Sequence, residues 1–136
     1  MGDRLAVVAI GGNSLIKDRM HQAVRDQYIA AHETSQHVAA MIADGWDVAI
    51  GHGNGPQVGF ILRRSELAAH ELHEVPLDAC GADSQGAIGY ALAQNLQNVL
   101  RRRGISADSA LRLARYFNTT PVASLKSAVN KLPWMN

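Results

Sequence analysis

The chain has 136 residues, of which 47% are hydrophobic and 18% charged, and its formal net charge is +1. This composition is typical of one small globular domain and excludes an intrinsically disordered chain. A net charge so close to zero provides no broad basic surface for nucleic acid. A single cysteine excludes an internal disulfide, and no apolar run approaches the ~18 residues of a transmembrane helix. Without a secretory signal at the N-terminus, we expect a cytoplasmic protein with no membrane partner.

Two short apolar runs in the first half of the chain predict strands of a buried parallel sheet. They cover residues 5–10 (LAVVAI) and 46–50 (WDVAI). Between them, apolar or small residues recur at steps of three and four over residues 20–44, which predicts a long helix that ends at Gly45. The expected buried face of this helix consists of Met20, Val24, Tyr28, Ala31, Ser35, Val38 and Ile42.

Helices are predicted for most of the second half. Pro56 suits the first turn of a helix, where its missing N–H is no loss. Residues 73–82 are expected to form a loop, after which Ser84 caps a third helix that ends at Gly104. The apolar side of that helix would consist of Ile88, Leu92, Leu96, Val99 and Leu100. Beyond Gly104 the spacing stays helical, although an α/β order calls for another strand.

The order strand, helix, strand, helix, helix indicates an α/β fold built on a parallel sheet. Each strand is followed by a glycine-rich loop, at residues 11–14 (GGNS) and 53–55 (GNG). Because crossovers between parallel strands are right-handed, both loops are expected at the carboxyl edge of the sheet.

Such loops have the chemistry of an anion site. Glycines let backbone N–H groups approach a ligand closely, and the start of a helix adds partial positive charge. Gly11, Gly12 and Asn13 would form one half of this site, and Gly53, Asn54 and Gly55 the other. Two anionic groups held side by side suit phosphoryl transfer. The alternative, that these glycines serve only the steric demands of a turn, stays open.

Other sites receive less support. Pro56 stands where a dinucleotide-binding fingerprint has its third glycine, and no P-loop lysine motif is present. The histidines His70 and His73, near Asp78 and Cys80, lack a second pair of ligands, so we predict no metal site.

Three segments together resemble carbamate kinase, a member of the amino-acid kinase family. They are residues 8–15 (VAIGGNSL), 51–59 (GHGNGPQVG) and 84–90 (SQGAIGY), and the resemblance covers about residues 5–104. It implies a three-layer parallel-sheet sandwich of amino-acid-kinase type and, usually, a homodimer. It also implies phosphoryl exchange between ATP and carbamate that gives ADP and carbamoyl phosphate, with Mg²⁺.

The resemblance further implies roles for individual residues. Gly11, Gly12 and Asn13 would hold the transferred phosphoryl group, and Gly53, Asn54 and Gly55 the carbamate. Ser84 and Gln85 would bind substrate from a helix start at the same edge. Two residues depart from the family pattern: Ser14 replaces an alanine, and Asp83 replaces an uncharged residue.

Carbamate kinases are longer than this chain, and residues 105–136 do not resemble their next segment. We therefore expect residues 1–104 to be the acceptor-binding half of a truncated kinase domain, followed by a divergent helical tail. The ATP site and its lysines would lie outside this half, so little kinase activity is expected from the chain alone. The alternative is a non-catalytic module that binds a small anion or pairs with a full-length homologue through the family's dimer surface.

Overall fold

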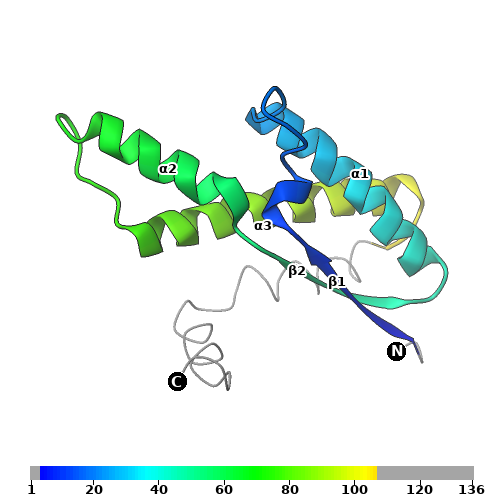
Figure 1. Ribbon diagram of the computed structural model, residues 1–136. Helices are drawn as coiled ribbons and strands as arrows, with labels where there is room; N and C mark the ends of the chain where they lie inside the picture. The colour runs from blue at the N-terminus through cyan, green and yellow to red at the C-terminus, as the bar shows by residue number, and fades with distance from the viewer. Residues whose placement is uncertain (1–3, 107–136) are drawn as a thin grey trace, which may run out of the picture.

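The computed structural model describes residues 4–106 and shows an α/β arrangement of two strands and three main helices (Figure 1). In chain order, the elements are β1 (Leu5–Ile10), the 3₁₀ turn η1 (Gly12–Ser14), α1 (Val24–Ala43), β2 (Asp47–His52), α2 (Gly55–Ala68) and α3 (Leu77–Arg102). The tail predicted for residues 105–136 lies almost wholly outside the described residues.

The two strands form a parallel sheet in which Leu5 pairs with Asp47 and Ile10 with His52. The connection between parallel neighbours must cross over the sheet, and α1 supplies that crossover. Both strands therefore end at the same edge, as the sequence predicts. The first strand was predicted with its observed bounds, whereas the second begins and ends slightly later than residues 46–50.

One face of the sheet carries the core. Val8 and Ile50 pack against both α1 and α3, between two clusters of buried side chains. The first cluster consists of Ile10, Leu15, Ala30, Ala31, Ile88, Ala91 and Leu92. The second consists of Val38, Ala39, Val48, Leu96, Val99 and Leu100. The predicted apolar side of α3 is confirmed, because all five of its residues are buried.

The opposite face of the sheet is open within the described residues. Leu5 and Val7 point to that side, and they are 68% and 76% exposed. Among residues 4–106 the sheet thus has one helical layer, formed by α1 and α3, while the other outer layer of the expected three-layer sandwich is not part of the described structure.

The first helix begins later than predicted. Met20 and Val24 are 86% and 67% exposed, so their placement on its buried face was wrong. The reason is local: Ala23 has an extended backbone, and its N–H donates to the Asp26 carboxylate at 3.1 Å. This capping contact starts the helix at Val24.

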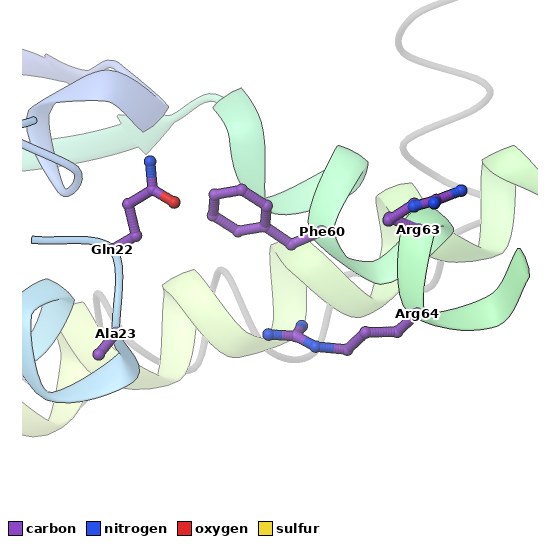
Figure 2. Close-up of a pocket in the computed structure, with 5 residues that line it drawn as sticks. All are labelled: Gln22, Ala23, Phe60, Arg63 and Arg64. Atoms are coloured by element: carbon purple, nitrogen blue, oxygen red, sulfur yellow. The ribbon is translucent and has the colours of Figure 1, made fainter. Parts of the chain in front are cut away.

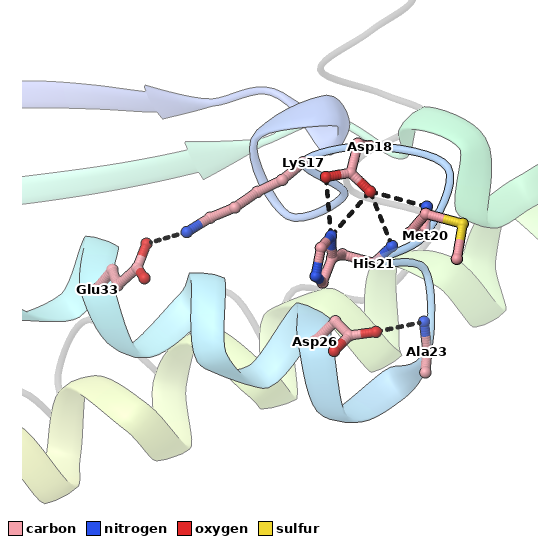
Figure 3. A network of polar contacts seen from close by, with 7 residues as sticks. All are labelled: Lys17, Asp18, Met20, His21, Ala23, Asp26 and Glu33. Atoms are coloured by element: carbon pink, nitrogen blue, oxygen red, sulfur yellow. Dashed lines mark hydrogen bonds and ion pairs between the residues drawn. The ribbon is translucent and has the colours of Figure 1, made fainter.

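A hydrogen-bonded loop precedes α1 instead (Figure 3). Asp18 accepts hydrogen bonds from the backbone N–H groups of Met20 and His21, at 2.7 and 3.0 Å, and pairs with the His21 ring at 2.8 Å. Lys17 pairs with Glu33 of α1 at 2.6 Å. These contacts connect the loop to α1 and take the place of the expected first helical turn.

The third helix begins earlier than predicted. It starts at Leu77, so part of the expected loop at residues 73–82 is helical. Pro76 is the cap: its backbone is extended, and its carbonyl accepts the N–H of Cys80 at 2.9 Å. The positive φ values of Gly45 and Gly104, 83° and 69°, confirm the predicted helix ends. No helix among the described residues is long and apolar enough to span a membrane.

Substitution of Leu100 tests the described packing of the core. Its side chain is fully buried (0% exposed), so Leu100→Ala should lower the free energy of unfolding by about 2–5 kcal/mol through cavity formation. The matched control is Leu67→Ala, at a position 61% exposed, which should change stability by about 0.5 kcal/mol or less. Urea unfolding followed by circular dichroism measures both. Equal losses would contradict this description of the core.

Substitution of Asp18 tests the hydrogen bonds of the loop that precedes α1. The hydrogen bond from His21, followed by that from the Met20 N–H, lowers the pKa of the Asp18 carboxyl below its usual 3.8. A lowered folded-state pKa stabilises the fold above the unfolded pKa, and this contribution is lost as the pH falls through the folded value. Asp18→Asn should therefore weaken the dependence of stability on pH below about pH 5, as measured by urea unfolding. Asp83→Asn on α3 is the control, and an identical pH profile for Asp18→Asn and the unmodified chain would refute the role of this contact.

Candidate functional site

The two glycine-rich loops meet at the carboxyl edge of the sheet, as predicted. A Cβ atom placed on Gly12 would lie 2.4 Å from both the Cα and the N atom of Gly55. A Cβ on Gly55 would lie 2.6 Å from the Gly12 Cα, and the φ of Gly55 is +51°. The contact is therefore backbone against backbone, and neither position has room for a side chain.

The first loop is a single 3₁₀ turn that presents free backbone donors. The N–H groups of Ser14, Leu15 and Ile16 donate to the carbonyls of Gly11, Gly12 and Asn13, at 2.9, 3.2 and 3.3 Å. The buried side chains of Leu15 and Ile16 anchor the turn beneath. Within the described residues the N–H groups of Gly11, Gly12 and Asn13 donate to no acceptor; Gly11 and Asn13 are exposed, whereas Gly12 is buried beneath them. Backbone N–H groups without an acceptor can bind an anion.

The second loop joins β2 to the start of α2. The Gly53 N–H donates to the Ile10 carbonyl at 3.0 Å, which extends the strand pairing into the loop. Asn54 follows at the N-cap of α2 without a side-chain capping bond. Its Oδ1 atom is buried with no hydrogen-bond partner in the described structure, and its Nδ2 lies 3.8 Å from a Cβ built on Gly81 of α3. Asn54 is thus a polar side chain held between α2 and α3.

Gln57 is part of the site although the sequence interpretation assigned it no role. Its side chain is 6% exposed, and Nε2 lies 3.4 Å from the Gly12 carbonyl oxygen and 3.3 Å from Oε1 of Gln27. The sequence feature that indicates a role for Gln57 is its position directly after Pro56, in the first turn of the helix that begins at the loop. Its contact with Gly12 spans 45 positions of sequence, which periodicity cannot detect.

Ser84 and Gln85 do not occupy the predicted helix start, which was wrong by about two turns. Ser84 is fully buried inside α3, where its hydroxyl donates to the Gly81 carbonyl at 2.8 Å. Gln85 is exposed. In this conformation Gly81, rather than Ser84, is the residue of α3 that lies beside Asn54. The cause is again the early start of α3 at Leu77.

The site carries no formal charge of its own. Residues 11–14 and 53–57 contain only glycine, asparagine, serine, proline and glutamine. In the part of the chain that the structure describes, no three histidine, cysteine, aspartate or glutamate side chains group as metal ligands. Attraction of an anion would therefore come from backbone N–H groups and the start of α2.

An open hollow of about 360 Å³ lies next to the site, lined by Gln22, Ala23, Phe60, Arg63 and Arg64 (Figure 2). The Arg64 side chain extends toward the start of α1, whereas that of Arg63 points away. The hollow connects to the loops through hydrogen bonds, because Gln27 donates to the Gln22 carbonyl at 3.0 Å and accepts from Gln57.

Comparison with known proteins supports the resemblance. A carbamate kinase-like protein of Escherichia coli, YahI, is 48% identical over 102 residues, which are 74% of this chain and 32% of the relative. Carbamate kinase of Pyrococcus horikoshii is 43% identical over 75% of this chain and 33% of its own length. Carbamate kinase of Giardia lamblia, solved bound to AMP-PNP, matches with a TM-score of 0.71 and 32% identity over 75% of this chain and 32% of that structure.

The chain is homologous to the N-terminal portion of carbamate kinases. No family model matches it. It spans about a third of the length of the curated carbamate kinases it matches. The predicted α/β fold of this family is confirmed for the described residues by the solved structures.

The contact between Gly12 and Gly55 can be tested with two neighbouring alanines. Gly12→Ala forces the loops apart, so it should destabilise the chain by about 1–3 kcal/mol, the usual effect of overpacking. Gly11→Ala is the control, because a Cβ there meets only Ser14 Oγ at 3.7 Å and the φ of −68° suits alanine. Urea unfolding measures both variants. If they lose equal stability, the loops do not touch as described.

Proposed function

We propose that the edge formed by residues 11–13 and 53–55 binds the acceptor in a carbamate-kinase reaction, in which ATP and carbamate exchange a phosphoryl group. The observation that supports this most directly is the backbone contact between Gly12 and Gly55. It puts two neutral, donor-rich loops side by side where a carbamate and a phosphoryl group could lie in contact. Homology to carbamate kinases supports the choice of substrate.

In this proposal the first loop holds the phosphoryl group and the second holds carbamate. Gly11, Gly12 and Asn13 offer three backbone N–H groups, and the Asn13 side-chain amide adds another donor. Gly53, Asn54 and Gly55 lie at the start of α2, where the helix dipole favours a carboxylate. A carbamate oxygen would attack the terminal phosphorus of ATP, and ADP would leave. Both loops act by positioning, since reaction needs the two atoms about 3–3.5 Å apart.

The positive charge for this reaction must come from elsewhere. Phosphoryl transfer depends on neutralising the phosphate oxygens, usually with lysine, arginine and Mg²⁺. Neither loop contains a cation or a carboxylate, so we assign no Mg²⁺ ligand to them. ATP as the donor is supported by the Giardia lamblia carbamate kinase solved with AMP-PNP. We expect the donor to be held by residues outside 4–106.

A second candidate is a non-catalytic module that binds an anion or associates with further copies. The exposed Leu5 and Val7 on the open sheet face favour it, because uncovered apolar strands promote association. A module of this kind would show no turnover, whether it binds an anion at the loops or only associates with further copies.

The test adds carbamoyl phosphate to the ¹⁵N-labelled 136-residue chain. We expect the backbone amide signals of residues 11–13 and 53–55 to shift, because the ligand would lie against both loops. Asn54→Ala should weaken binding by about tenfold, the loss of one hydrogen bond to a charged group, whereas Asn98→Ala on the exposed side of α3 should not. Shifts confined to other residues would reject the acceptor site.

Turnover is measured in the same samples, as ATP formed from ADP and carbamoyl phosphate with Mg²⁺. We expect no ATP above the rate without protein, since the described loops supply no charge for the donor. ATP formation at an enzyme-like rate would show that the chain does supply the donor side.

A further inference from the structure

We propose that Gln57 is a positioning residue that sets the direction of the Asn13 N–H through the carbonyl of Gly12. This inference rests on the proposed function, in which the Asn13 N–H binds the phosphoryl group. Gln57 itself is buried, and it would act on the ligand only through the first loop.

The link is the peptide unit between Gly12 and Asn13. In a trans peptide the C=O and the N–H point in opposite directions, and no cis peptide occurs in the described chain. The Gly12 carbonyl accepts the Leu15 N–H at 3.2 Å and the Gln57 side-chain amide at 3.4 Å. With this carbonyl held toward α2, the Asn13 N–H must point the other way. A glycine peptide needs such a restraint because glycine rotates more freely than any other residue.

Gln57 is itself held in one orientation. Nε2 donates to Gly12 and also to Oε1 of Gln27, so both amide hydrogens have acceptors. Turning the amide over would put Oε1 against two other oxygens, which is unfavourable. Gln27 in turn donates to the Gln22 carbonyl at 3.0 Å. A continuous series of hydrogen bonds thus joins the start of α1 to the Gly12 carbonyl.

Packing alone does not account for glutamine at this position. Its Oε1 atom is buried without a hydrogen-bond partner in the described structure, and a buried unpaired carbonyl lowers stability. Methionine has a similar length and no such atom. If Gln57 served the core only, methionine would serve it at least as well. A role in orienting the loop explains why an amide is there.

The test is Gln57→Met in the full 136-residue chain, with three readouts. Urea unfolding should show stability equal to or above that of the unmodified chain, because the unpaired carbonyl is gone. Affinity for carbamoyl phosphate, followed by NMR titration, should fall by about tenfold, because one hydrogen bond to a phosphate is misdirected. Residual dipolar couplings of the Asn13 N–H should show a changed direction without ligand.

The controls separate this role from general damage. Gln94→Met replaces an exposed glutamine of α3 whose side-chain amide donates to the Tyr90 hydroxyl, and it should leave all three readouts unchanged. Gln27→Met removes the neighbouring acceptor and should shift affinity in the same direction by less, which keeps the test usable if Gln57→Met fails to fold.

The outcomes are distinct. An unchanged Asn13 N–H direction in Gln57→Met and Gln27→Met would overturn the positioning role. So would stability and affinity that fall together in proportion, since that is the result for a purely structural residue. If the unmodified chain does not bind carbamoyl phosphate, the proposed function fails, and the dipolar couplings still decide whether Gln57 orients the loop.

Discussion

The backbone contact between Gly12 and Gly55 is the constraint on which the rest of the site depends. The two strands run parallel and end together at Ile10 and His52, so the two loops that follow leave the sheet side by side at its carboxyl edge. They can touch only if neither carries a side chain at the point of contact, because a Cβ on either would lie within 2.6 Å of the other backbone. The contact explains why both loops need glycine, and it sets the distance between the two groups of N–H donors.

The hydrophobic core holds this contact in place through the buried residues on either side of the first loop. Ile10 at the end of β1 and Leu15 just after the 3₁₀ turn are both buried in the cluster that α1 and α3 complete, with Ala31 and Ile88 among its members. The first loop therefore lies between two anchored residues only five positions apart. On the other side, the Gly53 N–H continues the strand pairing. Buried side chains thus fix both ends of the first loop, which suits a function that depends on position.

Much of this could be predicted from sequence, because it rests on local patterns. The strand at residues 5–10, the meeting of the two loops and the buried side of α3 follow from apolar runs, glycine positions and helical spacing. The errors arose where a few local hydrogen bonds override spacing. Asp18 and Asp26 form contacts that delay α1, and Pro76 starts α3 two turns before Ser84. The contact of Gln57 with Gly12 required the fold itself, since no local rule joins residues 45 positions apart.

Because both loops are neutral, the direction in which each backbone N–H points is especially important for binding an anion. A lysine or arginine attracts a phosphate over a range of positions, because its charge acts in all directions. A backbone N–H carries only a partial charge and is effective when it points at the oxygen it binds. An acceptor site built from such groups therefore gains its selectivity from how its peptides are turned. In this chain one such peptide follows Gly12, and two separate donors hold its carbonyl. A residue that hydrogen-bonds to the carbonyl of such a peptide therefore matters to the site, although it does not contact the ligand.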